Sequence, residues 1–422
     1  MSALVKNQSG RGGPSFKAMI MAAGFGTRLL PLTELIAKPM VPILNRPVME
    51  HILHLLVRHG VRDVAVNLHY HPDHIKGYFG DGSACGLHLR YIVERELLGT
   101  AGGVGNFRGF LADGTFVVVS GDALTDIDLT AFVAAHKENG GIATMAVMQV
   151  ADPSQYGVVV HDRCGRVTGF QEKPAREEAL SSLCNCGIYA FEPSIFKYIP
   201  DGEFVDFAHD VFPALLAAGE PFHVWQLRSY WNDVGNIEQY RSGNFDALHG
   251  RVQVRTPGTQ VTPGVYVGAD TEIAASATIL PPVLIGDRCQ IGPQVSLNGP
   301  LIIGDDCVIE AGATLDNVIH WNGATTGPNV LSFGSILGHG VTVHHNAIVS
   351  DGAVVGDGAD VAAHAVIASG ARLKPHTRVM AENGDRGGAG PGVDMLTTDR
   401  GVDAPADGGK PAADAPARPE AT

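Results

Sequence analysis

The fold of the first half of this chain is decided by the stretch Met19-Ile-Met-Ala-Ala-Gly-Phe-Gly-Thr-Arg-Leu-Leu-Pro-Leu-Thr-Glu-Leu-Ile-Ala-Lys-Pro-Met-Val-Pro42. An apolar run at residues 18–22 predicts a buried strand. It opens into Gly24-Phe-Gly-Thr-Arg28, where small residues leave backbone N–H groups free to surround a phosphate chain. Arg28 and Lys38 add positive charge beside this loop. Together these residues suit a nucleoside triphosphate.

The glycines of this loop do not define a site by themselves, because tight turns use glycine for steric reasons. Their spacing matches neither the dinucleotide-binding fingerprint nor the P-loop. The longer pattern, residues 24–33 followed by Lys38-Pro-Met-Val-Pro42, resembles the signature of the sugar-nucleotide pyrophosphorylases. Members of this family join a sugar 1-phosphate to a nucleoside triphosphate and release pyrophosphate.

The resemblance runs over residues 17–248 and is strongest to the bacterial mannose-1-phosphate guanylyltransferases. It implies an α/β fold with a Rossmann-like, mostly parallel sheet. The residues give the same indication, because short apolar runs alternate with helical patterns. A helix is predicted after Pro47, with strands at Val64–Leu68 and Phe116–Ser120.

The resemblance also assigns the nucleotide site and the phosphate-handling cations. Arg28 is expected to hold the departing pyrophosphate, and Lys38 and Lys173 to steady the phosphates. The segment Leu98–Gly102 is expected to lie against the base, where backbone groups would read its edge. The predicted nucleotide-binding residues are Ala23, Gly24, Gly26, Thr27, Gly99 and Thr100.

Two aspartates match the metal-binding positions of the family. Asp122 follows the predicted strand Phe116–Ser120, at the edge of the sheet where ligands bind in open α/β folds, and Asp233 lies in Tyr230-Trp-Asn-Asp-Val-Gly235. Mg²⁺ prefers such hard oxygen ligands. For Asp122 alone, a turn or helix-capping role is the competing interpretation. Asp126 and Asp128 are expected to cap the next helix.

The sugar-binding residues implied by the family are Glu172, Gly157 and Asn185. In Glu172-Lys-Pro174, a carboxylate would hold adjacent hydroxyl groups and an ammonium would reach the sugar phosphate. Without the resemblance, an exposed turn before a proline is the simpler interpretation of this tripeptide. Trp231 would cover the sugar or support the core.

From about residue 250 the chain changes to a period of six. Aliphatic residues recur at every sixth position from Val267 to Leu315 and again from Leu337 to Leu373. This period predicts a left-handed parallel β-helix in which residues eighteen apart stack, Cys289 on Cys307 among them. The stretch 316–336 breaks the period and is predicted to be a projecting loop.

These patterns divide the chain into four parts. We predict a disordered N-terminus (1–16), a nucleotidyltransferase domain (17–248), a left-handed β-helix of hexapeptide repeats (249–377) and a disordered tail (378–422). The tail is rich in Gly, Ala, Pro and Asp and has too few large apolar residues to form a core.

Charge and composition restrict the partners. The net charge of −14 argues against nucleic acid or an anionic membrane as a partner. No apolar stretch reaches the ~20 residues that cross a bilayer, and the N-terminal residues do not resemble a signal peptide. The six cysteines show no metal-binding spacing. We therefore expect a cytoplasmic protein, with a homo-oligomer as its assembly.

The predicted activity is formation of GDP-mannose from GTP and mannose 1-phosphate. Glucose 1-phosphate with dTTP, UTP or ATP is the alternative pair within the same chemistry. A catalytically silent regulatory paralogue and an acyltransferase in the β-helix are alternatives of other classes. The cluster His69, His71 and His74 is not expected to bind zinc, because Pro72 interrupts a common helical face.

Overall fold

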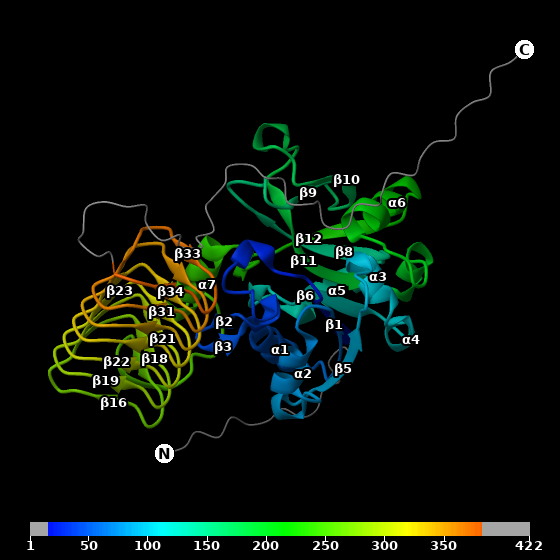
Figure 1. Cartoon of the computed structure of the whole chain (residues 1–422). Coiled ribbons are helices and arrows are strands. Elements are labelled where there is room, and N and C mark those ends of the chain that lie inside the picture. The colour runs from blue at the N-terminus through cyan, green and yellow to red at the C-terminus, as the bar shows by residue number, and fades with distance from the viewer. Residues whose placement is uncertain (1–15, 382–422) are drawn as a thin grey trace, which may run out of the picture.

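The computed structural model describes residues 16–381 and shows two parts lying side by side (Figure 1). An α/β part holds the mixed sheet, and a stack of triangular coils follows it. Helix α7 and the hairpin β2–β3 lie between them. In the described residues, no helix combines the length and apolar character needed to cross a membrane.

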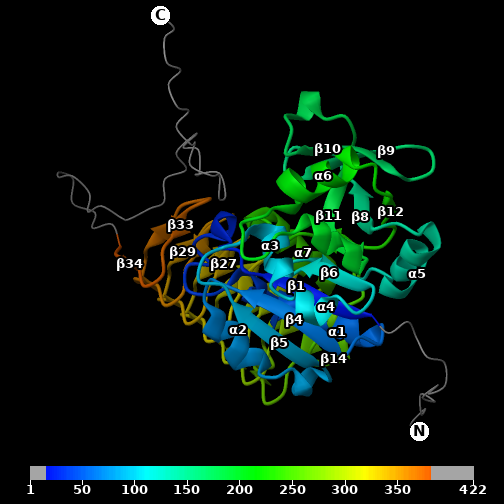
Figure 2. The same cartoon turned by 90° about the vertical axis from the view of Figure 1, so that its right-hand side faces the viewer.

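The sheet of the first part has nine strands, in the order β10-β9-β11-β6-β1-β4-β5, with β8 beside β11 and β12 beside β8. Figure 2 shows β5, β4, β1 and β6 next to one another. Strands β6, β1, β4 and β5 are parallel, whereas β11 runs antiparallel to β6. The strands are β1 (Lys17–Ala22), β4 (Asp63–Leu68), β5 (His88–Val93), β6 (Phe116–Ser120), β8 (Ala143–Gln149), β9 (Gly157–His161), β10 (Val167–Glu172), β11 (Leu183–Phe191) and β12 (Phe222–Gln226). Two short pairs are β2 (Pro42–Ile43) with β3 (Arg46–Pro47), and β7 (Leu124–Thr125) with β13 (Trp231–Asn232).

Helices cover both faces of this sheet, so the strands are buried from two sides. In β1, Ala18 and Ile20 pack with α1, α2 and α5, while Met19 packs with α3, α4 and α6. This explains why β1 is apolar throughout instead of alternating. The helices are α1 (Val48–Arg58), α2 (Pro72–Phe79), α3 (Gly99–Gly105), α4 (Arg108–Leu111), α5 (Leu129–Asn139), α6 (Phe212–Ala217) and α7 (Ile237–Leu248). The predicted strands and the helix after Pro47 are confirmed.

The second part is a left-handed parallel β-helix made of three sheets. The first strand of the stack pairs antiparallel with the strand that follows it, and the later short strands pair in parallel with the strand three places further along, one coil on. The first sheet contains β14 (Thr259–Thr262), β15 (Val265–Val267), β18 (Val283–Ile285), β21 (Leu301–Ile303), β24 (Ile319–His320), β27 (Ile336–Leu337), β30 (Val354–Val355) and β33 (Arg372–Leu373). The second contains β16 (Glu272–Ile273), β19 (Gln290–Ile291), β22 (Val308–Ile309), β25 (Thr325–Thr326), β28 (Thr342–Val343), β31 (Asp360–Val361) and β34 (Arg378–Val379). The third contains β17 (Thr278–Leu280), β20 (Ser296–Asn298), β23 (Thr314–Asp316), β26 (Leu331–Phe333), β29 (Ile348–Val349) and β32 (Val366–Ile367).

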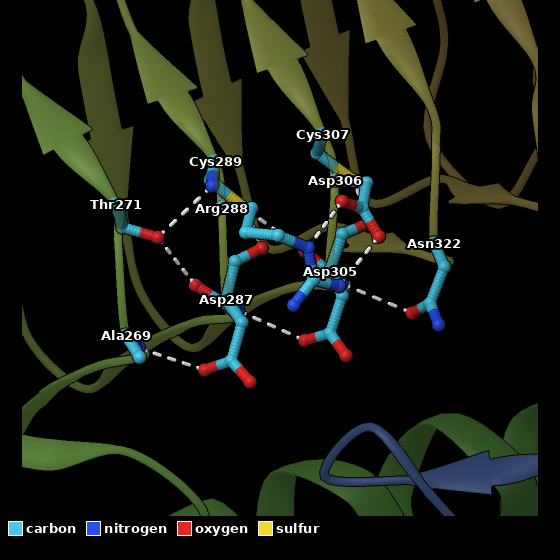
Figure 3. A network of polar contacts seen from close by, with 11 residues as sticks. Ala269, Thr271, Asp287, Arg288, Cys289, Asp305, Asp306, Cys307 and Asn322 are labelled. Atoms are coloured by element: carbon cyan, nitrogen blue, oxygen red, sulfur yellow. Dashed lines mark hydrogen bonds and ion pairs between the residues drawn. The ribbon is translucent and has the colours of Figure 1, made fainter.

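Polar side chains tie one corner of the coils together (Figure 3). The Asp287 carboxylate accepts a hydrogen bond from the Ala269 N–H at 2.7 Å, and the Asp305 carboxylate accepts one from the Asp287 N–H at 2.9 Å. The Asn322 amide oxygen accepts from the Asp305 N–H at 3.0 Å. Inside the same coils, Cys289 and Cys307 are buried at equivalent positions, as predicted.

The prediction of a projecting loop at 316–336 is wrong. This stretch forms a complete coil, in which Ile319 pairs with Ile302 before it and with Ile336 after it. Both partners lie seventeen residues away, one fewer than the eighteen that separate Ile302 from Leu284. Each of these two shortened steps keeps the stacking, and together they shift the six-residue period by two.

The same coil has a polar interior. For this reason the hydrophobic six-residue pattern did not identify it as part of the β-helix. His320, Thr326 and Ser332 point inward where the preceding coil has Ile303, Ile309 and Leu315. All three polar residues are buried. The apolar residues on either side of them form two separate clusters.

The β-helix also continues past its predicted end at residue 377. Arg378 and Val379 form β34, which pairs with Asp360 and Val361. The predicted boundary between β-helix and tail therefore falls one strand early. The predictions for residues 1–15 and 382–422 lie outside the described residues.

Candidate active site

The glycine loop follows β1 at the carboxyl end of the parallel strands. Ala23 is buried, whereas Gly24, Thr27 and Arg28 are exposed. Gly26 has a φ of 69°, and a Cβ there would lie 2.8 Å from the Lys38 Cβ. The Gly26 carbonyl also accepts a hydrogen bond from the Thr33 hydroxyl at 2.7 Å. Position 26 therefore needs glycine, because its backbone packs directly against Lys38.

Lys38 brings the two predicted metal-binding aspartates together. Its ammonium forms an ion pair with Asp122 and lies 3.4 Å from the Asp233 carbonyl oxygen. The Lys38 side chain is 11 % exposed, and the other Asp122 oxygen accepts a hydrogen bond from the Ser120 hydroxyl at 2.5 Å. Three residues far apart in the sequence thus meet at the edge where β1 and β6 end.

The Asp233 carboxyl is electrostatically unusual. Burial raises its pKa above the ordinary aspartate value, and the nearby negative charge of Asp122 raises it further. Lys38 and Arg28 oppose this shift, so Arg28 lies close enough to influence the site. The Asp233 Oδ1 atom is buried and accepts no hydrogen bond from the described residues.

These residues fit a divalent cation. Two neighbouring carboxylates, one with a raised pKa and an unpartnered buried oxygen, are stabilised by added positive charge. No group of three or more His, Cys, Asp or Glu side chains in residues 16–381 could hold a metal on its own. Such a site suits Mg²⁺, which is commonly bound by one or two carboxylates together with substrate phosphates.

The predicted sugar-binding residues lie at the paired ends of β9 and β10. Glu172 pairs with Gly157 across these strands, and a Cβ at Gly157 would lie 3.0 Å from a Glu172 carboxylate oxygen. The Lys173 ammonium is 3.3 Å from Glu172, and its side chain is 58 % exposed. Among the hydrogen bonds and ion pairs of the described residues, none joins Lys173 to Lys38 or to the two aspartates.

Asn185 lies in an irregular part of β11, where the register with β8 shifts. Its amide oxygen accepts a hydrogen bond from the Gly187 N–H at 2.9 Å, and its NH₂ group donates to the Tyr189 hydroxyl at 2.8 Å. The Trp231 indole N–H donates to the Cys186 carbonyl at 2.9 Å. The Trp231 ring also lies 5.6 Å from the ring of Tyr156, between centroids.

The segment expected against the base begins helix α3. A Cβ at Gly99 would lie 2.5 Å from the Val205 carbonyl oxygen, so this glycine permits a close approach of two backbones. The Thr100 hydroxyl donates to the Asp206 carboxylate and accepts from the Phe207 N–H, both at 2.8 Å. The side chain of Thr100 therefore joins α3 to the 203–207 segment.

Sequence reasoning missed two residues that support this region. Glu94 is buried directly after β5, and it accepts hydrogen bonds from the Asn67 amide at 2.8 Å and the Leu98 N–H at 3.2 Å. Asn67 in turn accepts from the Ala22 N–H at 3.0 Å. The position of Glu94 at the carboxyl end of a strand, like that of Asp122, was the available signal.

Gln239 was also missed. Its amide donates a hydrogen bond to the Tyr156 hydroxyl at 2.5 Å, and its Oε1 atom is buried without a partner in the described part of the chain. Burial and the Asp233 charge raise the pKa of Tyr156. Gln239 therefore connects the start of α7 with the sugar side of the site.

Several other expectations concern nearby side chains. The His69 ring binds the Glu94 carbonyl at 2.9 Å, and the His71 ring stacks on His74 at 5.2 Å. Asp128 caps α5 as predicted, by accepting from the Ala131 N–H. Asp126 does not cap that helix, since it accepts from the Tyr230 and Gln253 N–H groups.

Comparison with known families agrees with the fold. Residues 17–249 match the Nucleotidyl transferase family, and residues 279–385 match the GMPPB C-terminal domain. The first match covers more than half of the chain, which therefore belongs to the nucleotidyl transferase family.

Individual relatives have different activities. A UTP–glucose-1-phosphate uridylyltransferase of Synechocystis is 45% identical over 266 residues, which are 60% of this chain and 69% of the relative. A mannose-1-phosphate guanylyltransferase of Mycobacterium tuberculosis is 34% identical over 274 residues, 62% of this chain and 76% of the relative. The structure of a putative glucose-1-phosphate thymidylyltransferase from Bacillus anthracis has the same fold, with a TM-score of 0.52 and 23% identity over 58% of this chain and 98% of that one.

Proposed function

We propose that this protein transfers a nucleotidyl group from a nucleoside triphosphate to a hexose 1-phosphate, with release of pyrophosphate. The observation that carries the proposal is the meeting of Lys38, Asp122 and Asp233 behind the glycine loop. One ammonium between two acidic residues supplies the charges that a triphosphate and its cation require.

The reaction is a displacement at the α-phosphorus. A phosphate oxygen of the sugar 1-phosphate forms the new P–O bond, the bond to the β-phosphate breaks, and pyrophosphate leaves. Catalysis of this step depends mainly on positioning and on neutralising phosphate charge. Arg28 is exposed beside the loop and would hold the pyrophosphate, while Lys38 and Lys173 would steady the phosphates.

We propose that Ala23, Gly24, Gly26 and Thr27 bind the nucleotide phosphates, with Gly99 and Thr100 along the base. Glu172, Gly157 and Asn185 would bind the sugar. Asp122 and Asp233 would hold Mg²⁺, which when bound neutralises phosphate charge. The unpartnered oxygen of Asp233 supports this assignment.

The first substrate pair that we propose is UTP and glucose 1-phosphate, because the uridylyltransferase relative is 45% identical. The resemblance of the N-terminal domain to guanylyltransferases favours GTP and mannose 1-phosphate. That pair remains the second candidate, supported by the guanylyltransferase relative and by the match to the GMPPB C-terminal domain. The free thiols of all six cysteines support a cytoplasmic location. A homo-oligomer stays a prediction.

Pyrophosphate release by the full chain tests the proposal. The assay combines GTP, UTP, dTTP or ATP with glucose 1-phosphate or mannose 1-phosphate, with Mg²⁺ or with EDTA. Turnover with UTP and glucose 1-phosphate alone supports the first pair, and turnover with GTP and mannose 1-phosphate alone replaces it with the second. If every pair is inactive while nucleotide sugars still bind, the proposal is wrong and a regulatory paralogue becomes the better interpretation.

A further inference from the structure

One hydrophobic core is shared by the β-helix and the backs of both catalytic loops. On the β-helix side, this core contains outward-facing residues of successive coils in one sheet. On the other side it contains Leu29 and Leu32, which follow the glycine loop, and Val234, which follows Asp233. The β-helix residues are Leu284, Ile302, Ile319, Trp321, Ile336 and Val354.

The centre of this shared core is a buried polar contact. The Trp321 indole N–H donates a hydrogen bond of 2.7 Å to the Tyr240 hydroxyl. Trp321 is 1 % exposed and Tyr240 is fully buried. Trp321 directly follows His320 in the shortened coil, while Tyr240 belongs to the first turn of α7.

The first turn of α7 in turn holds the loop that carries Asp233. The Asn232 amide donates to the Gln239 carbonyl at 3.0 Å and accepts from the Val234 N–H at 2.8 Å. A Cβ at Gly235 would lie 2.5 Å from the Asp233 carboxylate and 2.8 Å from the Gln239 amide oxygen. Asp233 is thus packed against a helix that the β-helix anchors.

Further contacts fix the same two elements to the coils. Arg241 of α7 donates to the Asn317 carbonyl at 3.4 Å. Asn45, in the turn between β2 and β3, donates to the Ile303 carbonyl at 2.7 Å. The β2–β3 hairpin begins only two residues after the short helix Lys38–Met40. Both the Lys38 segment and the Asp233 segment therefore rest on one face of the β-helix.

We propose that the β-helix is a structural part of the metal site, and that Trp321 is its positioning residue. Through Tyr240 and the first turn of α7, Trp321 holds the Asp233 carboxylate in place near Asp122. The inference rests on the proposed function for its catalytic consequence. Its structural content, the geometry of a cation site, can be measured without turnover.

The test compares the same substitution, tryptophan to phenylalanine, at two positions. Trp321→Phe keeps an aromatic ring but removes the donor to Tyr240, and Trp225→Phe makes the same change where the ring contacts Phe132 at a distance of 5.5 Å. We expect Trp321→Phe to weaken binding of Mn²⁺ alone about tenfold, since partners that orient a metal ligand commonly matter by ~10–100-fold. It should also raise the Mg²⁺ concentration needed for half-maximal pyrophosphate release. Trp225→Phe should change neither quantity.

Tyr240→Phe provides a second test of the same hydrogen bond, because it removes only the hydroxyl group that accepts from Trp321. If the two residues act as one unit, the double variant should bind Mn²⁺ no more weakly than the worse single variant. Unchanged Mn²⁺ affinity in both folded single variants would overturn the inference. A wild-type protein that binds Mn²⁺ but turns over no substrate pair would refute the proposed function and leave the positioning role testable by Mn²⁺ binding.

Discussion

Lys38 and Asp233 are separated by 195 residues of sequence, yet the Lys38 ammonium lies 3.4 Å from the Asp233 carbonyl oxygen. The same ammonium pairs with the Asp122 carboxylate. The Lys38 ammonium therefore contacts both acidic residues that we propose as metal ligands. Because of this arrangement, we expect substitution of either the ammonium or a carboxylate to change metal binding.

Removing one carboxylate should abolish turnover without unfolding the protein. We expect Asp122→Asn and Asp233→Asn each to lower kcat by at least about 100-fold, the size of effect seen when a key electrostatic group is lost. Asp128→Asn is the matched control, because asparagine caps a helix as well as aspartate does. Pyrophosphate release and circular dichroism provide the measurements. Retained activity in either site variant would exclude these aspartates as the metal ligands.

Removing the ammonium should have opposite effects on metal binding and on catalysis. In Lys38→Gln, Asp122 and Asp233 lose their compensating charge, so Mn²⁺ alone should bind more tightly than in the wild type. Turnover should nevertheless fall, because Lys38 no longer steadies the phosphates. Calorimetric titration with Mn²⁺ measures the first effect. Weaker binding of Mn²⁺ would show that Lys38 supports the site in another way.

Metal binding should also depend on pH. The raised pKa of Asp233 means that its carboxyl takes up a proton at a higher pH than an ordinary aspartate does. Because a cation needs the deprotonated form, Mn²⁺ affinity should decrease as the pH falls, starting above the usual aspartate range. Titrations between about pH 4 and pH 8 would measure this dependence. Asp122→Asn should move it to lower pH, since the charge of Asp122 contributes to the shift.

Two glycines of the same loop should respond differently to alanine. In Gly26→Ala the new Cβ meets the Lys38 side chain at a positive φ, so we expect a loss of stability of ~1–3 kcal/mol. Gly24 has no described atom within 4 Å of such a Cβ, and Gly24→Ala should leave the free energy of unfolding unchanged. Urea unfolding compares them. Equal stability of the two variants would contradict the packing of Lys38 on the loop.

The buried histidine of the shortened coil should make stability depend on pH. Burial lowers the pKa of His320 to about 3, and neither ring nitrogen has a partner in the described part of the chain. The unfolded chain binds a proton near the ordinary value of 6.5, whereas the folded chain does not. The free energy of unfolding should therefore decrease as the pH falls from about 6.5 toward about 3.

His320→Leu removes this dependence and the unpartnered ring. At neutral pH the variant should be more stable by ~1–3 kcal/mol, the usual cost of an unsatisfied buried polar group. His88→Leu, at a largely exposed ring, should keep the pH profile of the wild type. Denaturant unfolding at several pH values measures both. A wild-type profile in His320→Leu would show that the ring has an unseen partner.

Much of the fold could be predicted, because its patterns are local. The apolar run before the glycine loop became β1, and the six-residue period became the β-helix. The coil containing His320 was not predicted, because it loses a residue and its inward aliphatic side chains at the same time. A search for aliphatic residues at every sixth position cannot identify a coil in which both the spacing and the polarity of the inward residues change.

The site was predictable only where its residues belong to one motif. Asp122, Asp233 and the glycine loop each stand in a recognisable stretch, but their contact through Lys38 required the structure. The hydrogen bond from Gln239 to Tyr156 joins residues 83 apart, and neither stretch signals the other. Such pairs arise from tertiary packing, and no spacing along the chain reveals them.

The shared core also limits how freely this protein can be recombined. A chimera that takes its coils from another β-helix would keep the stacking, because stacking depends on inward residues. It would lose the apolar support behind the glycine loop and the Asp233 loop unless Leu284, Ile302, Ile319, Trp321, Ile336 and Val354 were transplanted with it. We therefore expect the α/β part and the β-helix of this chain to be exchangeable only together.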